Sequence, residues 1–270
     1  PEYAIRLPLG GPRMRSRSYW NVNRPDSVAP FHRHELSLWV TDRQHRARSR
    51  THNTLSHTPE QQVSAAIVTL HGGQEVSRRA VRPWQPAALR MHPVLRAAAA
   101  AAPADVLLGQ VRYRYRGWNT GDPADDALRA LDELAELAEA PVVLVGHSMG
   151  ARAALKAASH PLVRGVLALA PWCPPEDSAA HLGEVPVVLL HGDRDRVTAP
   201  AESLDYVRRA RAAGTPAGLV MLRGGDHAML RRSGDWHRAA AEVVAQLLAP
   251  DPGSEGLAAR ACSAEGALQL

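Results

Sequence analysis

The sequence predicts an α/β fold, a three-layer α/β/α sandwich built around a mainly parallel sheet. From about residue 65 onward, short runs of branched apolar residues alternate with segments of helical periodicity. The apolar runs are continuous and bounded by glycine or proline, which is typical of strands buried on both faces. Strands that alternate with helices imply right-handed crossovers and helices on both sides of the sheet.

The predicted strands each end at a loop that is rich in glycine, proline or polar residues. One plausible strand, residues 35–40 (ELSLWV), comes before the alternating region. The later candidates are 65–70 (AAIVTL), 106–115 (VLLGQVRYRY), 142–145 (VVLV), 166–169 (VLAL), 185–190 (VPVVLL) and 219–222 (LVML).

The predicted helices lie between these strands. Residues 125–137 place four leucines three residues apart and begin with two aspartates, which suit the positive end of a helix dipole. Residues 203–213 and 236–248 have a similar amphipathic pattern. The alanine run at 97–102 is predicted to end a helix that begins near residue 76.

These elements divide the 270 residues into three regions. Residues 1–60 are predicted to form an irregular arm, rich in arginine and histidine, with one or two edge strands at most. Residues 61–250 form the α/β domain. Residues 251–270 are predicted to be a disordered tail, because small residues dominate there and follow no clear pattern.

The positive charge of the chain comes from the arm. The formal net charge is +5, and residues 1–60 hold ten arginines against five acidic residues, so the rest of the chain is balanced. The arm has no recognised nucleic-acid module and no basic helix with one patterned face, so we expect no nucleic-acid partner.

Cysteine content and apolar windows indicate where in the cell the protein is expected. Two cysteines, Cys173 and Cys262, cannot form a disulfide framework, and a reducing compartment is the simpler expectation. No apolar window has the length of a membrane span, and the first thirty residues lack a secretion signal. We therefore expect a cytoplasmic protein with no membrane partner, either a monomer or a homodimer.

The segment that carries most chemical information is Gly146-His147-Ser148-Met149-Gly150. It follows a buried strand directly and precedes an alanine-rich helical segment. Glycines two positions on either side of the serine permit a sharp strand-to-helix turn, and the following helix directs its N-terminal dipole at Ser148. This context predicts a serine nucleophile on a nucleophile elbow, although the five-residue pattern alone is weak.

A serine nucleophile needs a base and a group that orients the base. Two later strand ends supply candidates, because reactive residues gather at the carboxyl ends of parallel strands. The sequence His191-Gly192-Asp193-Arg194-Asp195 follows one strand, and a glycine-rich loop with Asp226 and His227 follows the next. Asp193 remains an alternative to Asp195 as the acid, and His237 an alternative to His227 as the base.

The order serine, acid, histidine resembles that of the α/β-hydrolase superfamily from about residue 65 to 249, nearer its small esterase and dienelactone-hydrolase-like branches. The resemblance implies Ser148 as the nucleophile, Asp195 as the triad acid and His227 as the general base. It also implies an oxyanion hole formed by the amide of Met149 and by a second amide, from Gly73 or Gln74. Trp172 and His147 are candidates for the substrate-binding surface. The alternatives are that His147 packs beneath the turn and that Trp172 belongs to the core.

The function expected from this resemblance is hydrolysis of a carboxylic ester or related acyl bond, such as a thioester or lactone, through an acyl-enzyme. The substrate is expected to be a small ester-like molecule, with no cofactor and no metal. An acyltransferase or lyase that uses the same triad, and a catalytically silent binding protein, are the alternatives. The connection at 173–184 is only a dozen residues long, so no large cap domain is expected there.

Overall fold

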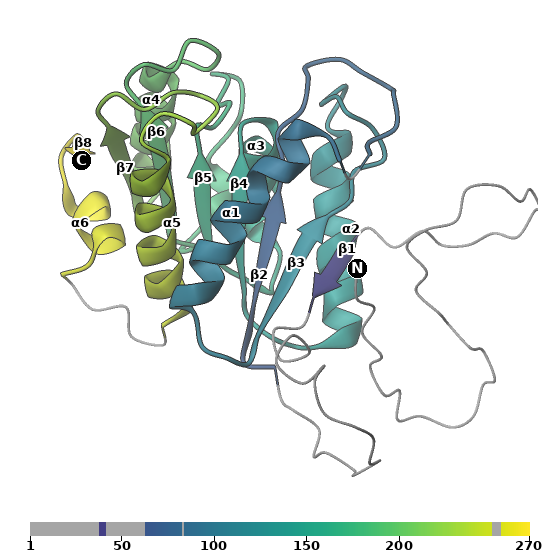
Figure 1. The fold of residues 1–270 in the computed structure, drawn as a ribbon. Coiled ribbons are helices and arrows are strands. Elements are labelled where there is room, and N and C mark those ends of the chain that lie inside the picture. Colours follow the sequence, from purple (N-terminus) through teal and green to yellow (C-terminus); the bar gives the residue numbers. More distant parts are fainter. Residues whose placement is uncertain (1–37, 42–62, 83, 250–254) are drawn as a thin grey trace, which may run out of the picture.

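The computed structural model describes residues 38–41, 63–82, 84–249 and 255–270 (Figure 1). In these ranges the strands form one eight-stranded sheet in the order β1-β3-β2-β4-β5-β6-β7-β8. The strands are β1 (Leu38–Thr41), β2 (Ala65–Leu70), β3 (Val106–Val111), β4 (Val142–His147), β5 (Val163–Leu169), β6 (Val187–Gly192), β7 (Ala217–Leu222) and β8 (Ala267–Gln269).

The sheet is parallel except at one edge. Strand β1 pairs with β3 in antiparallel fashion, and every other neighbouring pair runs parallel. Because parallel strands need crossover connections, the chain passes through a helix or a long loop between most of them. The carboxyl ends of β2 to β7 therefore meet at one end of the sheet, where their loops converge.

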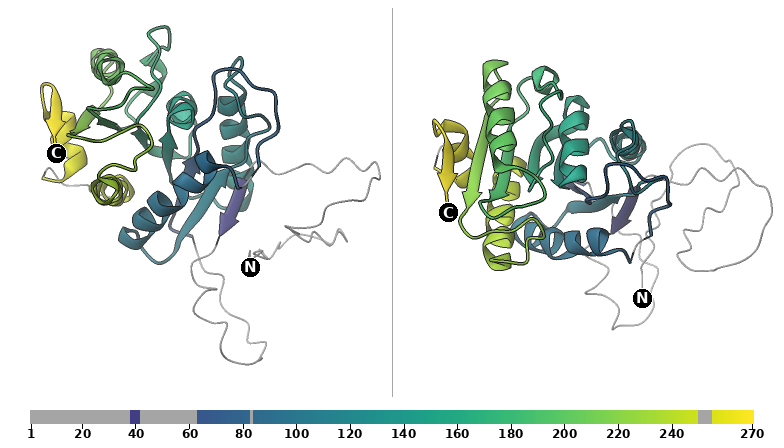
Figure 2. Two further views of the ribbon diagram at one scale, coloured as in Figure 1. Left: turned by 45° about the horizontal axis from the view of Figure 1, so that its top comes forward. Right: turned by 90° about the horizontal axis from the view of Figure 1, so that it is seen from above.

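Helices cover both faces of the sheet, which confirms the three-layer fold. Helices α1 (Pro86–Ala101), α5 (Ser233–Leu248) and α6 (Leu257–Ser263) contribute buried residues to the core on one face. Helices α2 (Asp122–Leu137), α3 (Met149–Lys156) and α4 (Pro200–Ala212) contribute to the core on the other face. The view along the sheet in Figure 2, right, shows the two helical layers with the strands between them.

The central strands have two buried faces, as their continuous apolar runs predict. In β4, Val142 and Leu144 join the core beneath α2 and α3, whereas Val143 and Val145 join the core beneath α1 and α5. Successive side chains of a strand point to opposite faces, so one apolar run supplies both cores.

Helix α1 begins later than the sequence predicts. The expectation was a start near Val76, but the helix starts at Pro86, a residue suited to the first turn of a helix because it needs no N–H donor there. The residues before it form a loop that pairs with the loop after β3, through isolated bridges from Gln74 to Gly117 and from Ala80 to Tyr115. This pairing also ends β3 at Val111, before the predicted end at residue 115.

The predicted disordered tail is wrong for the part of it that the structure describes, residues 255–270. Helix α6 packs beside β7, and β8 pairs with β7 in parallel. A Cβ atom on Gly218 would lie only 2.4 Å from the backbone carbon of Ala261, so the small residues permit a close approach of the helix to the strand. Small residues that looked too weak for a core thus serve direct backbone packing.

The N-terminal arm lies mostly outside the described residues. Strand β1 overlaps the predicted strand at 35–40, of which residues 35–37 are outside the described ranges. In the part of the chain that the structure describes, no helix has both the length and the apolar character needed to cross a bilayer.

The order of the tail can be tested at Leu257, which is 2% exposed in α6. Leu257→Ala is expected to lower the free energy of unfolding by about 2–4 kcal/mol, because it leaves a cavity beneath α6. The measurement is urea-induced unfolding. Leu137→Ala, at a helical leucine that is 41% exposed, is the matched control and is expected to cost less than about 1 kcal/mol. Equal midpoints for the Leu257 variant and the parent chain would contradict a packed tail.

Candidate active site

Ser148 occupies a strained turn between β4 and α3. Its backbone has φ 55° and ψ −119°, a conformation that costs energy for a residue with a side chain. The flanking glycines make the turn possible. A Cβ atom on Gly146 would lie 2.4 Å from the carbonyl oxygen of Gly150, and one on Gly150 would lie 2.3 Å from the carbonyl oxygen of Leu70. The strain is thus maintained by close backbone packing of α3 on β2 and β4.

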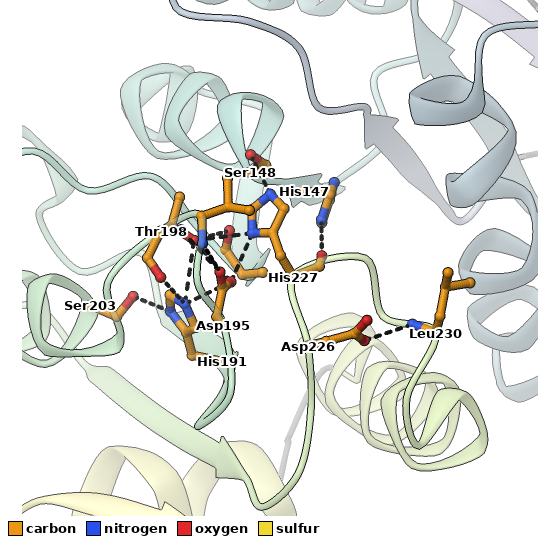
Figure 3. A network of polar contacts seen from close by, with 11 residues as sticks. His147, Ser148, His191, Asp195, Thr198, Ser203, Asp226, His227 and Leu230 are labelled. Carbon is orange, nitrogen blue, oxygen red and sulfur yellow. Dashed lines mark hydrogen bonds and ion pairs between the residues drawn. The ribbon is translucent and has the colours of Figure 1, made fainter.

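His227 lies beside Ser148, although 79 residues separate them in the sequence. The Nε2 atom of His227 is 3.1 Å from the hydroxyl oxygen of Ser148 (Figure 3). Ser148 comes from the end of β4, whereas His227 comes from the loop between β7 and α5. The pair is assembled at the carboxyl edge of the sheet, where sequence reasoning located the candidates.

Asp195 completes a continuous chain of hydrogen bonds. Its Oδ2 atom lies 2.7 Å from the Nδ1 atom of His227, and its side chain has no exposed area. Its Oδ1 atom accepts hydrogen bonds from the amides of Val197 at 2.8 Å and Thr198 at 3.0 Å. Burial alone raises the pKa of this carboxyl group, but hydrogen bonds from His191, His227 and the two amides outweigh burial and lower the pKa well below its usual value. Asp195 is therefore a carboxylate at neutral pH.

The alternative acid, Asp193, and the alternative base, His237, lie outside this chain of hydrogen bonds. The Oδ1 atom of Asp193 accepts a hydrogen bond from the amide of Gly224 at 2.6 Å, so Asp193 fixes the loop after β7. His237 lies within α5. Asp226 likewise holds its own loop, because its carboxylate accepts hydrogen bonds from the amides of Leu230 and Arg231, both at 2.9 Å. Only Asp195 among these acids contacts His227.

Two backbone amides near Ser148 are candidates for binding an anionic oxygen. Met149 is the first residue of α3, so its N–H group has no acceptor within the helix. The amide of Gly73 makes no hydrogen bond with any other described residue, whereas that of Gln74 donates to the carbonyl of Arg116 at 2.9 Å. A Cβ atom on Gly73 would lie 2.3 Å from the Arg116 oxygen, so glycine is required for this packing.

His147 is buried beneath the turn, so the interpretation that places it at the substrate-binding surface is wrong, and the alternative interpretation holds. It is 1% exposed, and its Nε2–H group donates to the carbonyl oxygen of His227 at 2.8 Å. Its Nδ1 atom has no hydrogen-bond partner and faces Gly72. Burial and the neighbouring His227 lower its pKa to about 3. His147 thus supports the loop of His227 from beneath and is not accessible to a substrate.

Trp172 lies next to the nucleophile turn, and its backbone amide donates to the carbonyl of Ser148 at 3.3 Å. The guanidinium carbon of Arg152 lies 4.2 Å from the centre of the Trp172 ring and 4.1 Å from that of Trp118. Arg152 also donates to both carboxylate oxygens of Asp177, at 2.6 and 3.1 Å. This buried cation fixes the loop after β5 on α3, with Trp172 partly exposed at the site.

Sequence reasoning missed two residues that contact Asp195. His191 lies 3.1 Å from its Oδ2 atom, and the hydroxyl of Thr198 donates to the same atom at 3.0 Å. His191 was visible in the motif as the histidine four residues before the acid, but nothing in the pattern indicated that its ring turns back toward the carboxylate. Within the described ranges, no group of three or more His, Cys, Asp or Glu side chains is arranged to hold a metal ion.

Comparison with known families agrees with this geometry. Residues 122–249 match a family model described as an alpha/beta hydrolase domain, and this region includes Ser148, Asp195 and His227. Residues 122–249 of this chain therefore form an α/β-hydrolase domain. No curated protein matches the sequence, and the assignment to a dienelactone-hydrolase-like branch stays a prediction.

Solved structures of distant sequence share the fold of this α/β-hydrolase. Est1E of Butyrivibrio proteoclasticus with bound ferulic acid is 11% identical, with a TM-score of 0.54 over 78% of this chain and 94% of that chain. An esterase/lipase from an uncultured bacterium is 14% identical, with a TM-score of 0.54 over 71% and 79%. A monoacylglycerol lipase of Paleococcus ferrophilus is 15% identical, with a TM-score of 0.50 over 69% and 97%. At these identities the likeness establishes the fold alone.

The burial of His147 predicts a specific acid sensitivity. The unfolded chain protonates this histidine below about pH 6.5, whereas the folded hydrolase does so only near pH 3. The unfolded state therefore binds the additional proton, and stability falls as the pH decreases between these values. His147→Gln retains a donor for the His227 carbonyl but does not titrate. Its unfolding free energy is expected to fall less steeply with decreasing pH, by up to about 1.4 kcal/mol per pH unit.

The measurement is urea unfolding of both proteins at several values between about pH 6 and pH 4. Identical slopes would show that His147 is protonated in the folded hydrolase.

Proposed function

We propose that this α/β-hydrolase is a serine hydrolase that cleaves a carboxylic ester or a related acyl bond. The observation that carries the proposal is the continuous chain from the Ser148 hydroxyl through His227 to Asp195, with separations of 3.1 and 2.7 Å. These residue types at these distances are what activation of a serine nucleophile requires.

The proposed reaction begins with removal of a proton from Ser148. His227 accepts it at Nε2 while the serine oxygen attacks the acyl carbon, and Asp195 orients the ring and stabilises its cation. The tetrahedral intermediate breaks down when its carbon–oxygen bond to the leaving group breaks. His227 gives its proton to the departing alcohol, and the acyl group stays on Ser148. Water, deprotonated by His227, then releases the acid.

The negative oxygen of the intermediate needs donors that are already in place. The amide of Met149 supplies one, and its position at the start of α3 adds the favourable end of the helix dipole. Of the two candidates for the second donor, the amide of Gly73 bonds to no other residue that the structure describes, whereas that of Gln74 donates to the carbonyl of Arg116. We therefore assign the second donor to Gly73.

The surroundings favour a small ester or one presented at a surface. The connection between β5 and β6 contains only a single short 3-10 turn, Ala180–Leu182, so no cap domain covers the site from there. Beside the oxyanion turn is an open hollow of about 200 Å³, bordered by Gly73 and by Pro86 and Ala87 of α1. Ser148 and His227 do not line this hollow, so the proposal of a small ester rests on the short connection between β5 and β6.

The first test is covalent labelling with a fluorophosphonate, read by intact mass. The parent chain is expected to gain one adduct, because an activated serine attacks phosphorus as it attacks an acyl carbon. Ser148→Ala and His227→Ala are expected to gain none, since one lacks the nucleophile and the other lacks the base. A folded parent chain that does not react would reject the serine-hydrolase function.

The choice of acid is tested by a matched pair of variants. Asp195→Asn is expected to lower kcat/KM for p-nitrophenyl acetate by about a thousandfold or more, because the ring of His227 loses its orienting carboxylate. Asp193→Asn removes a carboxylate from the same loop but leaves the chain to Ser148 intact, and it is expected to change kcat/KM only a few-fold. A larger loss in the Asp193 variant would reverse the assignment.

A further inference from the structure

A second histidine, His191, contacts the same carboxylate from the opposite side. His191 lies on β6 and is 0% exposed. Its Nε2 atom is 3.1 Å from Oδ2 of Asp195, and its Nδ1 atom is 2.7 Å from the hydroxyl oxygen of Ser203 on α4. Figure 3 shows Asp195 between the two imidazole rings, with Ser203 beyond His191. The reaction proposed above makes no use of this buried ring.

The hydrogen-bond donors and acceptors around His191 determine which of its ring nitrogens carries a hydrogen. Asp195 is a carboxylate and can only accept, so the Nε2 atom of His191 must carry a hydrogen. In the neutral ring Nδ1 is then bare, and it accepts a hydrogen bond from the hydroxyl of Ser203. The hydroxyl of Ser203 and the Nε2–H group of His191 therefore both point toward Asp195.

His191 and His227 share one oxygen of the carboxylate. Oδ2 lies 3.1 Å from His191, 2.7 Å from His227 and 3.0 Å from the hydroxyl of Thr198. We propose that His191, as a neutral ring with its hydrogen on Nε2, is a positioning residue that holds Oδ2 toward His227 and moderates the charge that His227 experiences. The proposal rests on the serine-hydrolase function proposed above.

The effect follows from competition for the same lone pairs. A donor on one side of Oδ2 withdraws negative charge from the acceptor on the other side. Without the His191 donor, the carboxylate would stabilise the cationic form of His227 more strongly. As the pH is lowered, activity would then begin to fall at a higher pH than in the parent chain. Among the described residues, the titratable groups that face His227 are Asp195, from the loop after β6, and His147 of β4, whose ring centre lies 5.0 Å from that of His227. His191 of β6 contacts Asp195 from the other side and is itself held by the hydroxyl of Ser203 on α4.

The test compares His191→Phe, which removes the donor, with His191→Gln, whose amide nitrogen reaches about as far as Nε2. Each kcat/KM is measured against pH with p-nitrophenyl acetate and divided by the fraction of chains labelled by a fluorophosphonate. In His191→Phe, the midpoint of the loss of kcat/KM on the acid side of the profile (the acid limb) is expected to move up by about half a pH unit. The maximal kcat/KM, on the plateau, is expected to fall about tenfold. In His191→Gln both are expected to stay close to those of the parent.

His181→Gln is the matched control at a histidine outside the site, where the ring contacts the carbonyl of Leu155. It is expected to leave the acid limb in place. A purely structural role for His191 would reduce the labelled fraction in both His191 variants without moving the acid limb. That outcome, or an unmoved limb in a well-folded His191→Phe, would overturn the proposal.

A second measurement uses the parent chain and does not depend on its activity. Long-range ¹H–¹⁵N correlation spectra of the histidine-labelled parent chain report which ring nitrogen carries hydrogen, with the signals of His191 identified from their loss in His191→Gln. The expected result is hydrogen on Nε2 alone, and hydrogen on Nδ1 would overturn the proposal. If the parent chain fails to react with the fluorophosphonate, the proposed function fails, and the tautomer then decides this inference alone.

Discussion

The close approach of α3 to the ends of β2 and β4 is the constraint on which the site depends. Gly146 and Gly150 leave no room for a side-chain carbon, because backbone atoms of the turn and of β2 lie within 2.4 Å of where it would be. This contact maintains the strained conformation of Ser148, whose hydroxyl lies beside His227. It also places Met149 at the start of α3, with its side chain packed against Gly73. A looser packing of the helix would displace the nucleophile and both candidate donors together.

The sequence was sufficient to predict the central sheet and the residues of the hydrogen-bonded chain. The run at 142–145 predicted β4 because continuous branched residues suit a strand with two buried faces, and both cores receive side chains from it. Asp195 and His227 could be located because parallel strands bring their carboxyl ends together. Ser148, Asp195 and His227 follow three different strands, and that topological rule placed them at one edge before any contact was known.

The remaining features depend on tertiary contacts that no local pattern encodes. Helix α6 and β8 looked too poor in large apolar residues to fold, yet Gly218 allows α6 to approach β7 directly, so their burial depends on a partner about forty residues away. For His147 the sequence left two interpretations open, a residue at the substrate-binding surface and one packed beneath the turn. Alternation along β4 turns its ring into the interior. The contact between His191 and Asp195 depends on how the loop after β6 folds back, which hydrogen bonds to Val197 and Thr198 decide.

The pairing of β8 with β7 affects the order in which the site forms. The amide of Arg223, at the start of the His227 loop, donates to the carbonyl of Leu270, and the amide of Leu270 donates to Met221. The loop that carries His227 is therefore anchored by the last strand of the sheet. Such contacts between distant parts of a chain form late in folding, because loop-closure entropy opposes them. A nascent or partly unfolded chain with an intact Ser148 turn would therefore still lack His227 at its position beside the serine until this edge of the sheet has closed.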